Sequence, residues 1–132
     1  MTATLPEQAY PFIDEPEFAT IATINPDGQP QLSVVWVERA GNDLVFSTVK
    51  GRRKHLNIDR DPRVTILIWP KANPWTYLEV RGTATYTEEG GRELIDRLCR
   101  KYTGNDRYTM DDGTDNVRIV VTVTPTKVIF RD

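Results

Sequence analysis

The side chains best suited to chemistry lie between residues 44 and 63. An apolar stretch, Leu44–Val49, reaches two hydroxyls at Ser47 and Thr48, and Gly51 then turns the chain. Four cations fall within five residues, namely Lys50, Arg52, Arg53 and Lys54. Arginine offers an oxyanion a bidentate fork, lysine offers a point charge, and a helix start adds unpaired N–H groups. The pattern therefore predicts a site for an anionic group such as a phosphate.

The same run of cations has a simpler interpretation as a solvated helix face, which is what most short charge runs are. Two features favour the anion site. The cations stand at the beginning of a predicted helix, where the helix dipole disfavours positive charge unless an anion is present. They also follow directly on a strand that ends in hydroxyls. The residues alone leave both interpretations open.

Other kinds of active site find no support in the sequence. One histidine, His55, and one cysteine, Cys99, are too few for a typical zinc site within one chain. No nucleophile with its base and no paired carboxylates stand out, so we predict neither a catalytic residue nor a metal ligand. Glycine-rich dinucleotide and P-loop patterns are absent as well. If the chain is an enzyme, a bound cofactor is expected to carry the chemistry.

The composition limits the class of protein. At 132 residues, with 27% charged and 39% hydrophobic residues, one folded domain over residues 1–132 is expected. A net charge of −2 argues against a general nucleic-acid binder. No apolar run approaches the roughly 18 residues of a membrane helix, and residues 1–14 do not resemble a signal peptide. A lone cysteine suits the reducing cytoplasm.

The elements that must position the cations are mostly strands. Strands are predicted over 18–24, 30–38 and 44–49, joined by the turns 25–28 and 40–43 into an antiparallel meander. A short helix over 51–60 ends before Pro62. An apolar strand over 64–69, expected to be buried on both faces, and a long strand over 75–87 follow. Gly82, in the middle of the long strand, predicts a bulge or a bend.

The last third of the chain begins with an amphipathic helix over 88–102. Its apolar residues share one face; they are Leu94, Ile95, Leu98, Cys99 and Tyr102. A polar, acidic loop over 103–116 and closing strands over 117–124 and 127–130, on either side of Pro125, complete the chain. About seven antiparallel strands joined by tight turns predict a mainly β fold, a closed or nearly closed barrel with flanking helices.

Two strands carry residues that suit the wall of a pocket. Gln31, Ser33 and Val35 share one face of the predicted strand 30–38, and that face runs from polar to apolar, as a pocket for a flat ring would. Trp75 and Tyr77 share a face of the long strand and suit stacking on a ring. An ordinary half-buried strand, or aromatic cover at a sheet end, is the commoner explanation of each pattern.

Three segments, taken together and in order, resemble the pyridoxamine-phosphate-oxidase-like flavoproteins. They are Phe18–Ser33, the cationic segment with Lys54-x-x-Asn57 and Asp61-Pro62-Arg63-Val64, and Trp75–Gly82. The resemblance covers roughly residues 18–87. It implies a split β-barrel of about 6–7 antiparallel strands and a homodimer with two cofactor sites at its interface. The chain is most similar to the actinobacterial branch that binds the deazaflavin coenzyme F-420, the alternative cofactor being FMN.

The resemblance also implies roles for individual residues. Arg52 and Lys54 would hold the cofactor phosphate, and Lys50 and Arg53 would help with it or with an acidic tail. Other residues would contact the ribityl chain or the ring, namely Gln31, Ser33, Val35, Ser47 and Thr48. Trp75 would close the site, with the partner subunit as one possible source, and Asn57 of the Lys54-x-x-Asn57 motif is a further cofactor-binding candidate.

The activity implied by the resemblance is that of an oxidoreductase. Reduced F-420 would transfer a hydride to an electron-poor small molecule, such as a conjugated enone or a quinone-like compound. An FMN-dependent oxidase or reductase and a non-catalytic cofactor-binding protein are the alternatives. Loop 103–116 carries no motif of the family, so the substrate is not implied. No nucleic-acid or membrane partner is expected.

Overall fold

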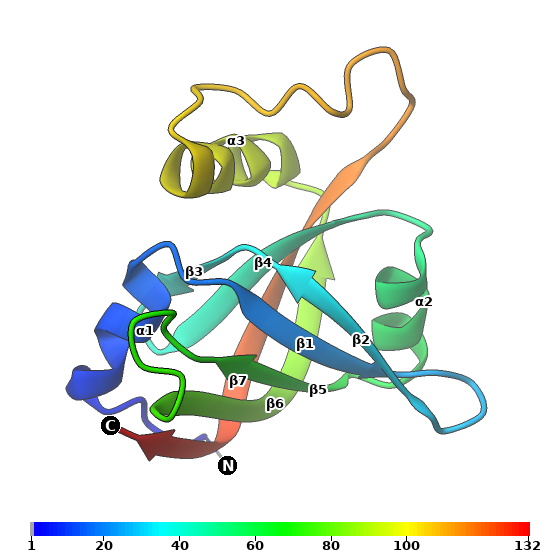
Figure 1. The fold of residues 1–132 in the computed structure, drawn as a ribbon. Helices are drawn as coiled ribbons and strands as arrows, with labels where there is room; N and C mark the ends of the chain where they lie inside the picture. The colour runs from blue at the N-terminus through cyan, green and yellow to red at the C-terminus, as the bar shows by residue number, and fades with distance from the viewer. Residues whose placement is uncertain (1) are drawn as a thin grey trace.

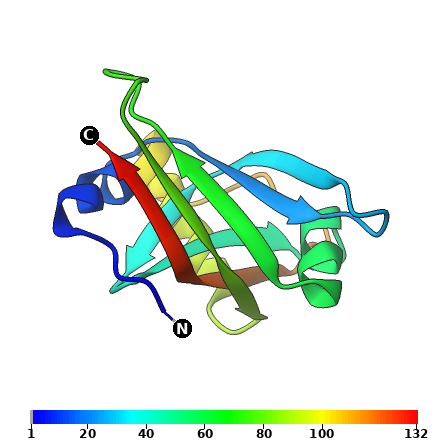
Figure 2. The same cartoon turned by 90° about the horizontal axis from the view of Figure 1, so that it is seen from below.

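The computed structural model describes residues 2–132, and its main feature is one curled antiparallel sheet (Figures 1 and 2). The strand order is β2-β1-β5-β6-β7-β4-β3. The strands are β1 (Ala19–Ile24), β2 (Pro30–Val35), β3 (Val37–Ala40), β4 (Asp43–Val49), β5 (Arg63–Ile68), β6 (Tyr77–Thr87) and β7 (Arg118–Arg131). The helical elements are the 3-10 helix η1 (Glu7–Ala9) and the α-helices α1 (Tyr10–Asp14), α2 (Arg53–Arg60) and α3 (Gly91–Thr103). The predicted mainly β split barrel is confirmed.

The curl of the sheet follows from its two edge strands. β2 pairs with β1 and β3 pairs with β4, so β2 and β3 are the two edges of the sheet. Only Trp36 separates them along the chain. Because a single residue spans the gap, the sheet must bend until its edges meet, and the split of the barrel lies at Trp36. The prediction of one strand over 30–38 within a meander is therefore wrong: the two hairpins form, but at opposite edges.

The two longest strands, β6 and β7, run side by side along their whole length. Their register shifts between Arg81 and Gly82, opposite Pro125. A Cβ at Gly82 would lie 2.3 Å from the carbonyl oxygen of Thr124, so this close approach requires glycine. The bulge predicted at Gly82 is confirmed. The two closing strands predicted on either side of Pro125 are one strand, because the irregularity accommodates a residue that cannot donate a ladder hydrogen bond.

Strand β5 shows which face of the sheet is left uncovered. Its buried residues alternate with exposed ones, and Leu67 points outward, so the expectation of burial on both faces is wrong. Thr20 of β1 pairs with both Leu67 and Val34, which places these residues in one row. Exposed apolar side chains gather along this side of the sheet. We call this set the outer apolar face: Phe18, Leu32, Val34, Leu67 and Trp69.

The helices flank the curled sheet, and α3 lies against the face formed by β4 and β7 (Figure 1). Leu94 and Leu98 of α3 pack on Val45 of β4, as the amphipathic pattern predicted. The segment 104–117 then arches back over the sheet to the start of β7, while α2 lies at the opposite end from α1 (Figures 1 and 2). Within residues 2–132, no helix has both the length and the apolar character to cross a membrane.

Candidate functional site

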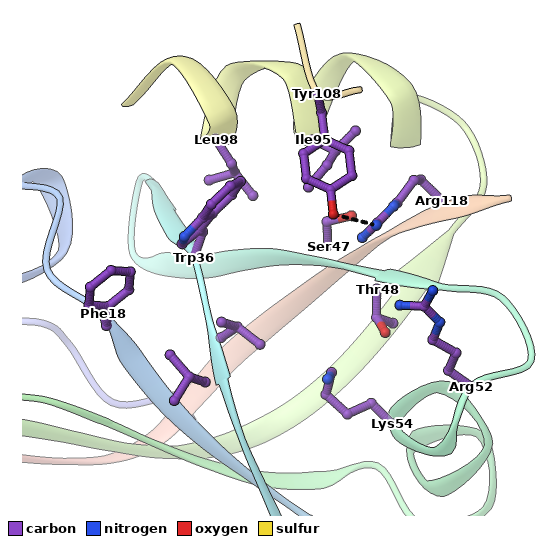
Figure 3. Close-up of a pocket in the computed structure, with 12 residues that line it drawn as sticks. Phe18, Trp36, Ser47, Thr48, Arg52, Lys54, Ile95, Leu98, Tyr108 and Arg118 are labelled. Carbon is purple, nitrogen blue, oxygen red and sulfur yellow. Dashed lines mark hydrogen bonds between the residues drawn. The ribbon is translucent and has the colours of Figure 1, made fainter. Parts of the chain in front are cut away.

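A cavity of about 240 Å³ lies where the β2–β3 junction, the end of β4 and the start of α2 face α3 (Figure 3). Five of the predicted site residues line it: Val35, Ser47, Thr48, Arg52 and Lys54. The other lining residues are Phe18, Val34, Trp36, Ile95, Leu98, Tyr108 and Arg118. Cations stand on one side of this cavity and aromatic rings on the other, and Arg118 and Tyr108 meet between the two sides.

The cationic side is formed by Arg52, Lys54 and Arg118. Lys54 Nζ donates a hydrogen bond of 3.0 Å to Ser33 Oγ, a neutral partner. Partial burial lowers the pKa of Lys54, and the charges of Arg52 and Arg118 lower it further. In the described part of the chain, no carboxylate lies within ion-pair distance of Arg52 or Lys54. This side therefore carries positive charge that an anion would compensate.

The local fold explains why the cations meet here. Gly51 has a φ of +91°, which turns the chain sharply after β4. Arg52 then takes the N-cap position of α2 with an extended backbone, and no side chain caps the helix start. The N–H groups of the first turn and the positive end of the helix dipole add to the charge of the side chains. A phosphate fits this combination of donors.

Two hydroxyls of β4 extend the polar wall. Thr48 is almost fully buried, and Ser47 Oγ is buried with no hydrogen-bond partner among residues 2–132. An orphaned buried hydroxyl is rare in folded proteins, because leaving it unpaired costs free energy. A polar group of a bound molecule would pair it. The residues present therefore fit a phosphate-bearing cofactor with hydrogen-bonding groups along its length.

The opposite side of the cavity is aromatic. Trp36 stacks on Tyr102, with ring centroids 5.4 Å apart, and meets Tyr108 edge-on at 6.0 Å. Tyr102 is itself fixed, since its hydroxyl accepts the Val37 N–H at 3.1 Å and donates to the Glu17 carbonyl at 2.7 Å. Burial raises the pKa of Tyr102, so the phenol stays neutral. These contacts hold the indole of Trp36 rigidly at the split of the barrel.

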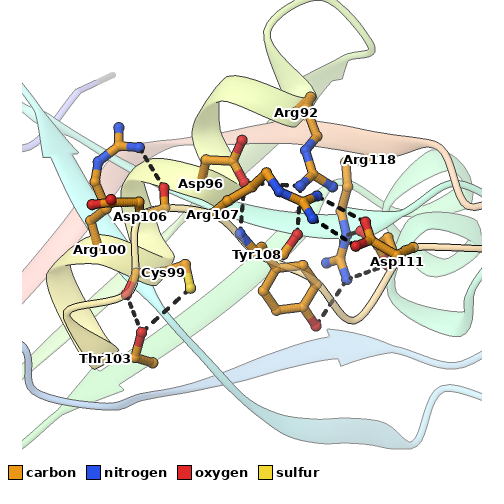
Figure 4. A network of polar contacts seen from close by, with 11 residues as sticks. Arg92, Asp96, Cys99, Arg100, Thr103, Asp106, Arg107, Tyr108, Asp111 and Arg118 are labelled. Atoms are coloured by element: carbon orange, nitrogen blue, oxygen red, sulfur yellow. Dashed lines mark hydrogen bonds and ion pairs between the residues drawn. The ribbon is translucent and has the colours of Figure 1, made fainter.

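The segment 104–117 brings Tyr108 to the cavity and contacts Arg118, the first residue of β7 (Figure 4). Asp111 accepts a 2.8 Å hydrogen bond from Arg118 Nε in a well-buried ion pair. Arg118 also donates to the Tyr108 hydroxyl at 3.3 Å, while Asp96 of α3 accepts the Tyr108 N–H at 2.8 Å. The predicted loop thus positions Tyr108 and Arg118, because it has polar partners on α3 and β7.

Two other predicted site residues, Asn57 and Gln31, form hydrogen bonds that stabilise the fold. Asn57 is fully buried, and its amide donates to Thr23 Oγ1 and Asn25 Oδ1, each at 3.0 Å. Gln31 accepts a hydrogen bond of 2.8 Å from the Thr23 hydroxyl. Both residues lie outside the cavity, where they join α2 to the hairpin of β1 and β2. Ser33, by contrast, reaches the site through Lys54.

Three predicted residues point elsewhere. Lys50 forms an exposed 2.6 Å ion pair with Glu88. Arg53 lines a separate surface hollow beside the 25–28 turn. Trp75 is 81% exposed in the turn before β6, which begins at Tyr77, two residues after the predicted start of the strand. Binding of a ligand by any of the predicted residues stays a prediction.

Sequence reasoning misses lining residues on both sides of the cavity. Phe18, Trp36 and Arg118 are not among the predicted site residues, and the sequence leaves open whether Tyr108 borders the site. Arg118 has one visible signal, since it is a cation at the start of an apolar strand, directly after an acidic loop. No sequence signal marks Trp36, because the break between β2 and β3 at this residue depends on the curl of the sheet.

The family model for pyridoxamine 5'-phosphate oxidase matches residues 5–132. The chain belongs to this family. Membership in the pyridoxamine 5'-phosphate oxidase family confirms the resemblance found in the sequence and indicates an oxidoreductase-like protein of the flavin and deazaflavin type. No curated protein sequence matches the chain.

Several solved structures resemble the chain over most of its length. An F420 reductase is 28% identical with a TM-score of 0.83, over 95% of this chain and 98% of that one. A conserved hypothetical protein from Mycobacterium tuberculosis is 25% identical with a TM-score of 0.79, over 99% and 86%. General Stress Protein 26 from Bacillus anthracis, 16% identical with a TM-score of 0.73 over 96% and 92%, shares the fold.

Proposed function

We propose that this protein is an oxidoreductase that uses reduced coenzyme F-420 to transfer a hydride to an electron-poor small molecule. A conjugated enone or a quinone-like compound is the expected acceptor class. The observation that carries the proposal is the pair of cations without carboxylates, Arg52 and Lys54, beside the unpaired Ser47 hydroxyl. The similarity to an F420 reductase favours F-420 over FMN as the group that these residues bind.

Each side of the cavity would have its own task. Arg52, Lys54 and the start of α2 would bind the phosphate, and Ser47 and Thr48 would pair with polar groups further along the cofactor. The apolar wall around Trp36 would hold the flat rings and exclude water. When bound, the reduced deazaflavin supplies a hydride. The chain itself binds, orients and shields the reactants.

We also propose that the protein works as a homodimer, with a second copy seated on the outer apolar face. Leu32 and Val34 are each 65% exposed. A row of apolar side chains in contact with water is unfavourable, and such patches commonly mark a binding surface. Phe18 and Val34 line both the cavity and a neighbouring hollow that contains Trp69. The apolar face is therefore continuous with the cavity, and a partner seated there would help to enclose the ligand.

A titration of F-420 and FMN side by side tests the cofactor. We expect the fluorescence of F-420 to be quenched on binding. Arg52→Ala and Lys54→Ala should each weaken binding by about 1–3 kcal/mol, because a charge-assisted hydrogen bond is lost. Arg53→Ala is the matched control, since the Arg53 side chain lies outside the cavity. Unchanged affinity in both cavity variants would place the phosphate elsewhere.

Two further outcomes would change the proposal. Stoichiometric FMN with no measurable F-420 binding would make the protein an FMN-dependent enzyme on the same fold. A screen of enones and quinones against reduced F-420 tests turnover. Tight F-420 binding with no oxidation by any acceptor would instead indicate a protein that carries the cofactor without catalysis.

A further inference from the structure

His55, the only histidine of the chain, lies in the first turn of α2 and is 8% exposed. Its Nδ1 atom accepts a hydrogen bond of 2.8 Å from the Gly51 N–H. A backbone N–H can only donate, so Nδ1 must be the unprotonated nitrogen of a neutral ring. The proton is therefore on Nε2.

This hydrogen bond differs from the usual cap of a helix. Serine, threonine, aspartate or asparagine commonly takes the N-cap position and covers N–H groups of the first turn. Here the N-cap residue is Arg52, which has no acceptor, and no side chain caps the helix. His55 instead reaches back to the residue before the cap. The turn at Gly51 is fixed, while the N–H groups at the helix start stay open.

The neutrality of the acceptor matters as much as its position. Glutamate, the residue that most often reaches back from this helical position, would make a similar bond. It would also place a carboxylate beside Arg52 and Lys54 and cancel the charge that an anionic ligand needs. A neutral imidazole holds the turn without competing for the cations.

The remaining contacts of the ring are with Tyr86 and give it no second hydrogen bond within residues 2–132. The ring packs edge-on against Tyr86, at 4.6 Å between centroids, and the Tyr86 hydroxyl donates to Asp59 Oδ1 at 2.6 Å. His55 Nε2 is buried with no hydrogen-bond partner among residues 2–132. An unpaired buried N–H costs free energy. Within residues 2–132, the bond at Nδ1 is therefore the hydrogen bond that anchors the ring.

We propose that His55 is the positioning residue of the anion site. By accepting the Gly51 N–H, it holds Arg52 and Lys54 toward the cavity and leaves the helix start free for a phosphate. This inference rests on the proposed function, because it assigns the anion to the cofactor.

The tautomer of His55 can be measured without any ligand. Nitrogen-15 NMR of the imidazole is unambiguous, since the chain has one histidine. At neutral pH we expect the Nε2–H tautomer with an unprotonated Nδ1. The Nδ1–H tautomer, or an average of the two, would overturn the proposal.

Two variants separate the acceptor from the packing of the ring. His55→Asn keeps an acceptor near the position of Nδ1 but loses the ring, whereas His55→Phe keeps a ring against Tyr86 but has no acceptor. We expect His55→Phe to bind F-420 about five- to tenfold more weakly, with a thermal midpoint near that of the parent. We expect His55→Asn to unfold at a lower temperature and yet to keep affinity within about twofold. Losses of affinity that merely follow the losses of thermal stability would overturn the proposal.

A second probe separates this inference from the choice of cofactor. Inorganic pyrophosphate should shift the backbone amide signals of Arg53 and Lys54 in the parent and in His55→Asn, and much less in His55→Phe. If the parent binds neither F-420 nor FMN but shows these shifts, the proposed function fails and the role of His55 stands. If pyrophosphate shifts neither amide in the parent, the positioning role is wrong.

Discussion

Lys54 Nζ donates its hydrogen bond to Ser33 Oγ, and this bond joins the start of α2 to the edge strand β2. A hydroxyl satisfies one donor of the ammonium group but leaves its charge uncompensated. The lowered pKa of Lys54 reflects the same fact, since burial and two neighbouring arginines disfavour its charged form. The unliganded protein therefore carries a cost at this residue that an anion would remove.

Replacing Lys54 with methionine should separate stability from binding. Lys54→Met removes a partly desolvated cation and keeps a side chain of similar length. We expect the free energy of unfolding without ligand to stay level or to rise by less than about 1 kcal/mol, since solvent screens part of the charge. Affinity for F-420 should fall by about 1–3 kcal/mol. Urea unfolding and a fluorescence titration measure the two quantities.

The pH dependence of Lys54 should have opposite signs for folding and for binding. Between its lowered pKa and the ordinary lysine value of about 10.4, the unfolded chain binds more protons than the folded one. The contribution of Lys54 to the free energy of unfolding therefore rises with pH across that window. Anion affinity should fall across the same window, because the ligand needs the charged form. Lys54→Arg stays charged, so a parallel fall in that variant would assign the effect to another group.

The buried ion pair of Asp111 and Arg118 should support the segment that carries Tyr108. Hydrogen bonds from Arg118 lower the pKa of Asp111, so its contribution is full above the ordinary carboxyl value of about 4 and is lost as pH falls through the lowered value. We expect Asp111→Asn to cost about 2 kcal/mol at pH 7, because Arg118 loses its carboxylate. Unfolding in urea at pH 7 and at pH 3 should show that difference shrinking.

The neighbouring exposed pair of Arg107 and Asp112 provides the control for that experiment. Both side chains are about half exposed, at 53% and 51%. Asp112→Asn should therefore change stability little at either pH, because solvent screens the pair. An effect as large as that of Asp111→Asn would show that the whole segment, rather than the buried pair, supports the fold.

The packing of α3 on β7 should depend on Gly91. A Cβ at this residue would lie 1.9 Å from the backbone oxygen of Arg118, so one element has to move. We expect Gly91→Ala to destabilise the protein by about 1–3 kcal/mol and to weaken ligand binding by displacing Arg118. Glu93→Ala, at an exposed position of the same helix turn, is the control. Equal stability of the two variants would contradict the close approach.

The outer apolar face should determine whether the protein is a dimer in solution. The chain has a mass of 15.1 kDa, and light scattering should give about twice that value for the dimer. Leu32→Glu places a charge on the face without touching the cavity and should produce monomers. Met110→Glu alters another exposed apolar residue, on segment 104–117, and should leave the dimer intact. A monomeric parent would remove the basis for a shared site.

Local sequence patterns are enough to predict most of the strands and helices and the cationic part of the site. The alternation of residues in β1 and β6, the apolar face of α3 and the bulge at Gly82 are properties of short segments, so the sequence by itself predicts them. The cationic turn at Lys54 is visible for the same reason.

The remaining features depend on contacts between distant segments. Trp36 ends β2 because the curl of the sheet brings two edges together, which no pattern within 30–38 reveals. Arg118 and Tyr108 reach the cavity through an ion pair and hydrogen bonds made across α3, β7 and the acidic segment. Asn57 stands near the cations along the chain, yet only its tertiary contacts with Thr23 and Asn25 show that it joins α2 to a hairpin. Local periodicity therefore predicts the elements, whereas the partners of polar groups are settled by long-range packing.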